Sequence, residues 1–421
     1  MALLIQKGWL HDHGVVDILI RDGRIAEIGP DLVLDDETDP ERLDASGLAV
    51  VPGLVNGHTH AAMTLFRGYG DDMHLLEWLE KRIWPAEAKL TEEDVYWGTK
   101  LACLEMIRSG TVSFQDMYWH FHGMARAVEE MGVRAGVGAV MIDVAGPDQA
   151  EQCKRDAEQM LEESSRYSDR VRFVLTPHAI YTVSPESLRW VAEFSEKNDL
   201  LTHIHLSETP TEVSQCLEQH GVRPALHLDN CGLLTPRALL AHGVHLEEDE
   251  LDLIAKRGST IVTNPVSNMK LAVGGVFPYS KAAERGIPMA LGTDGAASNN
   301  SLDLFQDLKV FALIQKHADQ DPTALPATDA WPVVTGAKAP LLGQSGVVAE
   351  GEKADLLLIR REEIEVTPQH DFVSNMVYVA TGQVVDSTIV DGKILMRHRE
   401  IAGEEEIRRE ASERARVICG G

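Results

Sequence analysis

Two histidines separated by one residue, His58 and His60, lie in the segment PGLVNGHTH (residues 52–60). Side chains at positions i and i+2 of an extended strand point to the same side of it. Both imidazoles can therefore reach one metal ion from a single strand. The pair alone is a weak signal. It becomes informative only if further candidate ligands lie at the ends of other strands.

Four more side chains of the required types stand at or just beyond the ends of strand-like segments. His205 lies in LLTHIHL and is followed by Glu208, His242 ends ALLAH, and Asp294 ends IPMALGTD. Imidazole nitrogens and carboxylate oxygens are ligands of Zn²⁺ and of Fe²⁺. The recurrence of these residue types at separate strand ends predicts a divalent metal site.

One ambiguity concerns the strand that contains His205. His203 lies two residues earlier and points to the same side, so the spacing does not choose between the two histidines. Position does favour one of them, because His205 is nearer the strand end and precedes an acidic residue by three positions. We therefore expect His205 to be the ligand.

The middle of the chain alternates strand-like and helical segments in the manner of a (β/α)₈ barrel, which gathers its active site at the carboxyl ends of the strands. An open doubly wound sheet is the alternative, but no GxGxxG follows a first strand. Thr91 and Asp94 resemble a capping box that opens a helix over 91–109, ended by Gly110. A first strand should end near Asn56, and the other expected strands are 111–115, 133–142, 171–176, 200–206, 238–241, 260–263 and 287–292.

Both ends of the chain differ from the middle in sequence pattern, because they contain short β-rich segments and Asp-Gly turns. The segments 15–20 and 25–28 flank one such turn, and 354–359, 384–390 and 393–396 lie near the other end. We expect one small β-sandwich domain assembled from residues 1–52 and 346–421, the latter ending in a charged helix. Residues 53–345 are then the catalytic barrel.

Composition restricts the partners. Lys and Arg number 39 against 66 Asp and Glu, which gives a formal net charge of −27. Such a chain repels nucleic acid and anionic lipid, so neither is an expected partner, while a homo-oligomer is compatible with the sequence. The five cysteines are scattered without a CxxC, and no signal peptide or apolar run of membrane-spanning length is present. These features predict a cytoplasmic protein.

The motifs together resemble a known family. PGLVNGHTH, HLSET (205–209), AHGVHL (241–246) and LGTDGAASNN (291–300) are similar to those of the amidohydrolase superfamily. More narrowly, they resemble its deaminases for 5′-methylthioadenosine and S-adenosylhomocysteine. The resemblance runs from about residue 1 to 396 and implies a hydrolase acting on C–N bonds of cyclic amidines.

The resemblance also implies the ligand set. His58, His60, His205 and Asp294 would hold one divalent ion per chain, Zn²⁺ in the first place with Fe²⁺ as an alternative. Two-metal members of the superfamily require a bridging lysine at the end of the fourth strand. That strand ends VLTPHAIY here, with His178 and no lysine, so one ion is expected.

Deamination of an adenine ring needs a hydroxide, a proton for the ring nitrogen and a proton for departing ammonia. A divalent ion supplies the hydroxide by lowering the pKa of water. Asp294 is placed to take up the water proton and return it to the leaving group. Glu208 would protonate the ring nitrogen, and His242 would orient and polarise the attacking oxygen.

Substrate contacts follow from the resemblance as well. Glu87 matches a glutamate that binds the ribose hydroxyls, His178 a histidine that contacts the substrate, and Ser298 a position near the purine; Glu208 and Asp294 would also contact the ring. The segment after the third strand, AVMIDVA (139–145), offers no arginine for an amino-acid carboxylate. Methylthioadenosine and adenosine are therefore favoured over S-adenosylhomocysteine, and Leu65, Phe66, Trp78 and Trp84 would surround an apolar tail.

Two other interpretations stay open. The same metal site could deaminate another ring, such as a guanine, a pterin or a triazine, although Glu87 and His178 favour a ribosylated substrate. A catalytically inactive scaffold would have lost metal ligands, and this chain keeps all of them. The zinc nucleobase deaminases with an HxE and PCxxC signature are excluded, because the sequence has no PCxxC.

Overall fold

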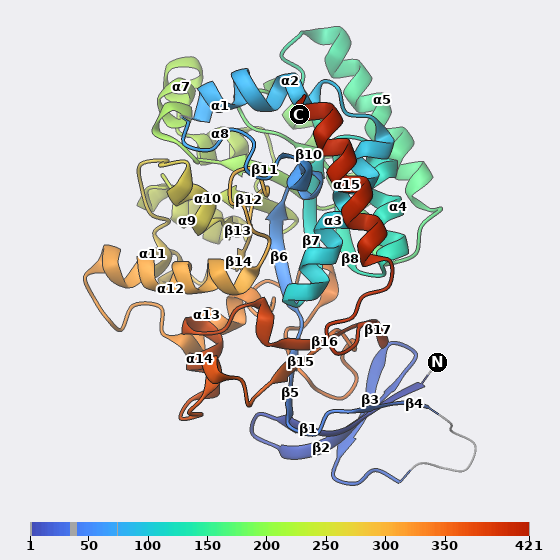
Figure 1. Cartoon of the computed structure of the whole chain (residues 1–421). Coiled ribbons are helices and arrows are strands. Elements are labelled where there is room, and N and C mark those ends of the chain that lie inside the picture. The colour runs from blue at the N-terminus through green and yellow to red at the C-terminus, as the bar shows by residue number, and fades with distance from the viewer. Residues whose placement is uncertain (1, 34–39, 74, 421) are drawn as a thin grey trace.

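The computed structural model describes residues 2–33, 40–73 and 75–420. It is an α/β structure in which parallel strands are surrounded by helices, and a mixed sheet containing both terminal regions lies at one end (Figure 1). None of the described helices combines the length and the apolar character needed to cross a membrane.

The parallel strands form two arrays. The first has the order β10-β8-β7-β6 with β9 also paired to β8, and the second has the order β11-β12-β13-β14. The strands are β6 (Leu54–Thr59), β7 (Thr111–Tyr118), β8 (Arg134–Met141), β9 (Val171–Phe173), β10 (Thr176–Pro177), β11 (Thr202–Leu206), β12 (Ala238–His242), β13 (Thr260–Thr263) and β14 (Met289–Leu291).

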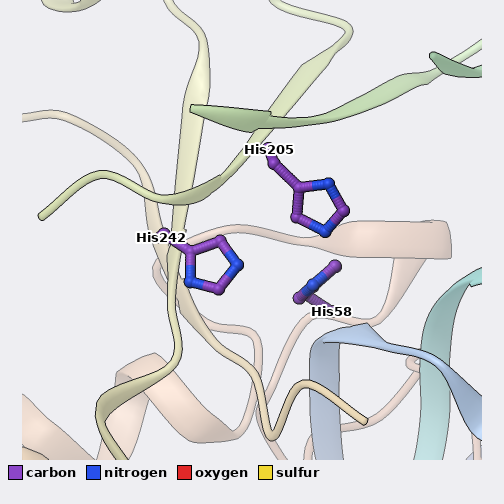
Figure 2. Close-up of side chains that lie close together, drawn as sticks. All are labelled: His58, His205 and His242. Carbon is purple, nitrogen blue, oxygen red and sulfur yellow. The ribbon is translucent and has the colours of Figure 1, made fainter. Parts of the chain in front are cut away.

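The two arrays meet on both sides. An isolated parallel bridge pairs Leu175 with Thr202, between β10 and β11. On the other side, the backbone N–H of Asp294, just after β14, donates to the carbonyl of His58 in β6 at 3.0 Å. The carboxyl ends of β6, β11 and β12 thus converge, and His58, His205 and His242 turn their rings toward one another there (Figure 2).

The first of the parallel strands is longer than predicted. β6 continues to Thr59, so His58 lies within the strand and His60 directly after it, at the entry to the 3₁₀ helix η1 (Ala61–Phe66). The segment expected as one strand over 171–176 is instead interrupted between β9 and β10. β13 has the predicted bounds, Thr260–Thr263.

The helix expected after Thr91 is α3 (Glu92–Ser109), and the predicted capping box is confirmed. The Thr91 side chain accepts from the backbone N–H of Asp94, and the Asp94 carboxylate accepts from that of Thr91. Gly110 ends the helix with φ 93°, a left-handed conformation that glycine adopts without strain. The other helices of eight or more residues are α4 (Phe121–Met131), α5 (Pro147–Ser164), α6 (Pro185–Asn198), α7 (Pro210–His220), α9 (Glu248–Arg257), α12 (Leu304–Asp319), α13 (Ala327–Val334) and α15 (Glu404–Cys419).

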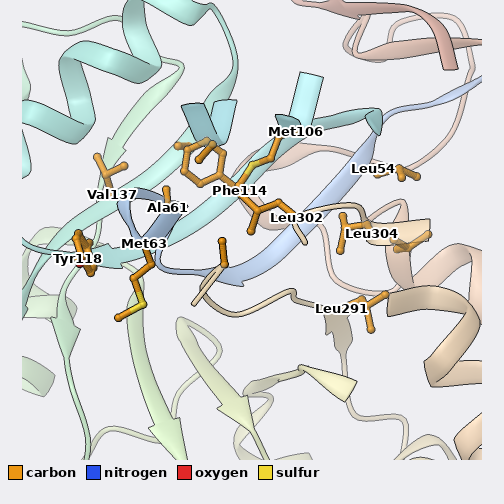
Figure 3. Packing of buried hydrophobic residues seen from close by; sticks show 14 of the residues in the cluster. Leu54, Ala61, Met63, Met106, Phe114, Tyr118, Val137, Leu291, Leu302 and Leu304 are labelled. Carbon is orange, nitrogen blue, oxygen red and sulfur yellow. The ribbon is translucent and has the colours of Figure 1, made fainter. Parts of the chain in front are cut away.

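Apolar side chains fill the space between the strands and the helices that cover them. Phe114 of β7 packs near Met106 of α3, and Leu54 and Leu302 lie in the same cluster (Figure 3). One expectation about this region is wrong. Leu65 and Phe66, expected to surround a substrate tail, belong to this core, with 4% and 0% of their surface exposed, because η1 turns them inward.

The two terminal regions share one sheet of eight strands. Its order is β17-β16-β15-β5-β1-β2-β3, with β4 paired to β1. The join is antiparallel, between β5 and β15, and Leu3, Ile18, Leu356 and Ile389 belong to its core. The strands are β1 (Ala2–Leu10), β2 (Gly14–Arg21), β3 (Arg24–Gly29), β4 (Glu41–Asp44), β5 (Leu48–Pro52), β15 (Leu356–Arg360), β16 (Val385–Val390) and β17 (Lys393–Met396).

Two contacts tie this sheet and the C-terminal helix to the parallel strands. The guanidinium of Arg134 in β8 is only 2% exposed and binds Asp355 at 2.8 Å and Asp391 at 2.7 Å. Helix α15 packs along α3 (Figure 1), with Arg414 bound to Asp94 at 2.9 Å. The charged tail helix therefore buries one face, through Ile407 and other apolar residues, and exposes the other.

Candidate metal centre and active site

The predicted ligands form one cluster at the carboxyl ends of the strands. Nε2 of His58 and Nε2 of His60 lie 3.3 and 3.2 Å from the same carboxylate oxygen, Oδ1 of Asp294. His58 also belongs to a second group, with His205 and His242, in which one ligand atom of each residue lies within 4.8 Å of the others. Because both groups share His58, they define a single centre; Figure 2 shows its three histidines His58, His205 and His242.

Hydrogen bonds behind the imidazoles show that the residues fit a metal ion. Nδ1 of His60 lies 2.6 Å from the carbonyl of Met117, and Nδ1 of His205 lies 2.7 Å from the carbonyl of His178. A carbonyl only accepts, so each Nδ1 carries the ring proton and each Nε2 is left as a donor atom for a metal. Nε2 of His58 is buried and makes no well-formed hydrogen bond; the nearest carboxylate oxygen is Oδ1 of Asp294 at 3.3 Å, as expected where an ion would lie between them.

His203 and His205 take different positions in the fold. His203 is fully buried, and its Nε2 lies 2.9 Å from Nδ1 of His58. With His58 Nε2 left for the ion, Nδ1 of His58 donates this hydrogen bond. His203 thus contacts His58 on the side away from Asp294, whereas His205 belongs to the group of ligand atoms around His58 Nε2.

The electrostatics agree with this arrangement. Burial, and then the neighbouring imidazoles, hold the pKa of His205 well below its usual value, so the ring is neutral. Burial alone would raise the pKa of Asp294, but its interactions with the adjacent imidazoles of His58 and His60 hold it well below its usual value. Burial would lower the pKa of His60, but Asp294 outweighs this effect and raises the pKa to about 9. An ion bound at His60 would therefore displace a proton.

Asp294 is held by its own neighbours. Its backbone has φ 61°, a left-handed conformation that is uncommon for a residue with a side chain. The hydroxyls of Ser267 and Ser298 donate to Oδ2 at 2.6 and 3.0 Å. Ser298, predicted near the purine, therefore lines the site while bound to Asp294, and Ser267 was not identified from the sequence.

Glu208 and His242 lie together on the cavity wall. Oε1 of Glu208 is 3.9 Å from Nδ1 of His242, and Nδ1 of His242 donates to the amide oxygen of Asn268 at 2.8 Å. The other nitrogen of His242 is thereby free to face a substrate. Burial raises the pKa of Glu208, which favours the protonated form that a proton donor needs.

Glu212 is a buried carboxylate that the sequence analysis missed. It lies in the first turn of α7 and is 3% exposed. Its two oxygens accept the backbone N–H groups of Ser207 and Glu208, each at 2.8 Å. The only sequence signal near Glu212 is Thr209, three residues earlier, and this spacing predicts a helix cap. Thr209 does cap the helix, since its hydroxyl oxygen accepts from the backbone N–H of Glu212 at 3.1 Å.

Two adjacent cavities lie at the centre and share part of their lining. The inner cavity, of about 100 Å³, is lined by His60, His205, Glu208, His242 and Asp294 among others. The outer chamber, of about 1280 Å³, is lined mainly by apolar side chains. The boundary between the two cavities, called the passage below, is formed by the residues that line both of them, namely Leu79, Trp84, Glu87, Trp119, Ile142, His178, Tyr181 and Leu271.

The two predicted sugar contacts therefore stand at this passage. Burial raises the pKa of Glu87, and the neighbouring Tyr118 hydroxyl opposes that shift. Nδ1 of His178 lies 2.9 Å from the Thr182 hydroxyl, which itself donates to the carbonyl of Ala179. The Thr182 oxygen thus accepts from His178 Nδ1, and Nε2 of His178 is left as an acceptor. Of the tail residues, Trp78 lines the inner cavity and Trp84 both.

Histidines and an aspartate gathered at the carboxyl ends of parallel strands, beside a buried glutamate, are features of metal-dependent hydrolases. The chain belongs to the amidohydrolase family: the sequence profile described as "Amidohydrolase family" matches residues 49–395.

Several relatives are similar over nearly the whole chain. A 5′-deoxyadenosine deaminase of Methanoregula boonei is 46% identical over 404 residues, which cover 95% of this chain and 91% of the relative. A 5-methylthioadenosine/S-adenosylhomocysteine deaminase of Archaeoglobus fulgidus is 43% identical over 427 residues and the full length of both chains.

Solved structures are similar too. The crystal structure of an adenosine deaminase from Xanthomonas campestris with bound zinc has a TM-score of 0.92 at 32% identity, covering 100% of this chain and 99% of that one. An atrazine chlorohydrolase from Arthrobacter aurescens shares the fold, with a TM-score of 0.90 at 21% identity. The similarity covers 98% of this chain and 100% of that one.

Proposed function

We propose that this protein hydrolyses the 6-amino group of the adenine ring in 5′-modified adenosines, releasing ammonia and the inosine analogue. The substrates would be 5′-methylthioadenosine, 5′-deoxyadenosine and adenosine, with S-adenosylhomocysteine a poorer one. The observation that carries the proposal is the placement of buried Glu208 and His242 beside the histidine–aspartate centre, with Glu87 at the passage. The names of the two relatives and of the zinc-bound structure support it.

The cofactor would be one divalent ion per chain, held by His58, His60, His205 and Asp294. Zn²⁺ suits three imidazoles and a carboxylate, and Fe²⁺ is the alternative. When bound, such an ion lowers the pKa of water toward neutrality and so makes hydroxide available. The hydrogen bonds to Met117, His178 and His203 support this assignment, because they leave the Nε2 atoms free.

The side chains would move the protons. Water adds to C6 of the ring, a C–O bond forms, the C–N bond breaks, and ammonia leaves. Asp294 would take the proton that the water loses and return it to the leaving amine. Glu208 would donate a proton to the adjacent ring nitrogen and would recover one from the C6 hydroxyl as the carbonyl forms, and the free nitrogen of His242 would orient the entering oxygen.

The sugar would lie at the passage between the cavities. A carboxylate can accept hydrogen bonds from both hydroxyls of a vicinal diol, so Glu87 would bind the ribose 2′ and 3′ hydroxyls. Nε2 of His178 would accept a further hydrogen bond from the substrate. Ser298 would contribute to the wall near the purine.

The architecture that we infer is a (β/α)₈ barrel over 53–345 with a small β-sandwich from 1–52 and 346–421. The contacts that join the two parallel arrays on both sides support closure of the barrel, and the pairing of β5 with β15 supports the shared small domain. All five cysteines are free thiols, which supports the expected cytoplasmic location.

A comparison of substrates tests the proposal. Ammonia release should be measured with the adenosines named above, with guanine and with a triazine. Adenosines should be deaminated, and 2′-deoxyadenosine should lose roughly 10- to 100-fold in kcat/KM relative to adenosine, because one hydrogen bond to a charged group is lost.

The variant Glu87→Ala should nearly abolish that preference, whereas Glu80→Ala, an exposed glutamate in the same segment, should keep it. Activity confined to guanine or a triazine would replace the proposal by an aminohydrolase of another ring. A full preference for adenosine in Glu87→Ala would exclude Glu87 as the ribose contact.

A further inference from the structure

The outer chamber is much larger than the inner cavity and has a different lining. Pockets that bind small molecules usually measure about 300–1,000 Å³. The inner cavity of about 100 Å³ is below this range, and the outer chamber of about 1280 Å³ is above it. A substrate whose ring reaches Glu208 must therefore extend through the passage into the chamber.

The direction of that extension follows from the proposed function, on which this inference rests. With the adenine ring in the inner cavity and the ribose hydroxyls at Glu87, the sugar occupies the passage. Its 5′ carbon is the remaining point of attachment and leads away from the ring. The group attached there is thus the part of the substrate that meets the chamber.

The chamber offers this group an apolar surface. Apolar side chains come from three separate loops or helix ends, namely Trp84, Ile142, Val144, Leu271 and Val273. Val144 is 69% exposed and Trp84 is 47% exposed, so both present surface that a ligand could cover. Covering such surface with an apolar group is favourable roughly in proportion to the area removed from water.

The chamber offers no permanently cationic side chain. Its described lining residues include no lysine or arginine, and its carboxyl and imidazole groups belong to Glu87, Glu212, His120 and His178. A negatively charged 5′ group would find no lysine or arginine there and would be repelled by Glu87 and Glu212 in their ionised forms. The same residues impose no such penalty on a neutral group.

We propose that the outer chamber selects adenosines whose 5′ substituent is uncharged, apolar and larger than methyl, so that 5′-S-alkyl-thioadenosines with chains up to butyl are better substrates than 5′-methylthioadenosine.

The test is a series of 5′-S-methyl, ethyl, propyl and butyl thioadenosines, together with the 5′-S-(3-carboxypropyl) compound. Each methylene that becomes buried should raise kcat/KM by up to about fourfold. The butyl compound should then exceed the methyl compound by at least about tenfold, allowing for partial burial in an open chamber. The carboxypropyl compound should fall at least tenfold below the butyl compound, by loss of apolar contact and by repulsion.

Two variants locate the effect. In Val144→Asn/Leu271→Asn the ratio of kcat/KM for butyl over methyl should fall at least threefold. This ratio is internal to each variant, so a general loss of activity does not change it. In Val15→Asn, where a similarly exposed valine of the terminal sheet is replaced, the ratio should equal that of the wild type.

The outcomes separate this inference from the proposed function. If methylthioadenosine is deaminated but the butyl compound is equal or worse, the chamber does not select apolar groups and the inference is wrong while the function stands. A wild-type ratio in the double variant would also overturn it. If no adenosine is deaminated, the proposed function fails and this inference fails with it.

Discussion

Replacement of Glu212 by glutamine should separate positioning of Glu208 from general stability. Glu212 is buried in the first turn of α7, and its two oxygens accept the N–H groups of Ser207 and Glu208 at 2.8 Å. A glutamine has only one acceptor oxygen in its side chain. Its NH₂ group would then face one of the two backbone N–H groups, and two donors cannot form a hydrogen bond with each other. The backbone that carries Glu208 would have to move or lose a hydrogen bond.

The size of the effect follows from these two bonds. A hydrogen bond to a charged group contributes about 1.5–3 kcal/mol, so Glu212→Gln should lower the free energy of unfolding by about that amount. A displacement of a catalytic group by about 1 Å can cost roughly 100-fold in rate, so kcat should fall about 10- to 100-fold. KM should change less than threefold, because Glu208 is expected to act mainly in the transition state.

The pH profile gives a readout that a structural role alone would not change. Burial raises the pKa of Glu212 to about 7, although both N–H groups oppose the shift. Protonation below that pH removes an acceptor much as glutamine does. Wild-type kcat should therefore rise with pH through about 7, and Glu212→Gln should lack this rise.

The assay needs three proteins, compared by steady-state kinetics, urea unfolding and metal analysis. Glu212→Gln should keep its metal, because Glu212 bonds to no metal ligand in the structure. Glu218→Gln, an exposed glutamate of the same helix, should behave as the wild type. Loss of stability in Glu212→Gln with unchanged kcat and an unchanged pH profile would refute the positioning role.

Of three further predictions, two concern the centre and one concerns a remote histidine. Elemental analysis should find about one transition-metal ion per active chain, with activity lost on chelation; two ions per chain would contradict the single site. Glu208→Gln should keep the metal but lose about 10²–10⁴ in kcat, the usual contribution of general acid–base catalysis, and near-normal turnover would assign the proton to another group. Burial, and then the charges of His220 and Arg189, lower the pKa of His227 from 6.5 to about 4, and His220 stacks on it with ring centroids 3.9 Å apart. The folded chain thus binds fewer protons than the unfolded chain between these values, so this contribution to stability is present above pH 6.5 and is lost as the pH falls toward 4. Between pH 7 and 5 urea unfolding should show a loss of about 2 kcal/mol that His227→Asn does not share, and equal losses in both proteins would refute the assignment.

Local sequence patterns predicted the elements best where local forces determine them. The capping box of Thr91 and Asp94 and the left-handed Gly110 were both found as expected, because each depends on residues within one turn. The end of β6 was placed too early, at Asn56. The strand continues through His58 to Thr59 because pairing with β7 supports it, and pairing between distant segments leaves no local signal.

The site shows the same division. Spacing predicted that His58 and His60 act together, since strand geometry alone makes them neighbours. It could not rank His203 against His205, because the difference lies in a contact with His58 across 145 residues of sequence. Glu212 and Ser267 escaped notice for a related reason: each acts on a residue that only the fold brings near, through the backbone of Glu208 or the carboxylate of Asp294.

These positions suggest how chemistry and substrate range are divided in this protein. The groups around the centre lie at strand ends. Hydrogen bonds to carbonyls or side chains of neighbouring strands hold them in place, as the Met117 carbonyl does for His60. The apolar wall of the outer chamber instead comes from loops and helix ends, including Val144, Leu271 and Val273. Loops tolerate substitution better than strands that pack on a core. If the chamber holds the 5′ group as proposed, replacements in these loops should change which 5′ groups the protein accepts, whereas a different reaction would require different residues at the strand ends.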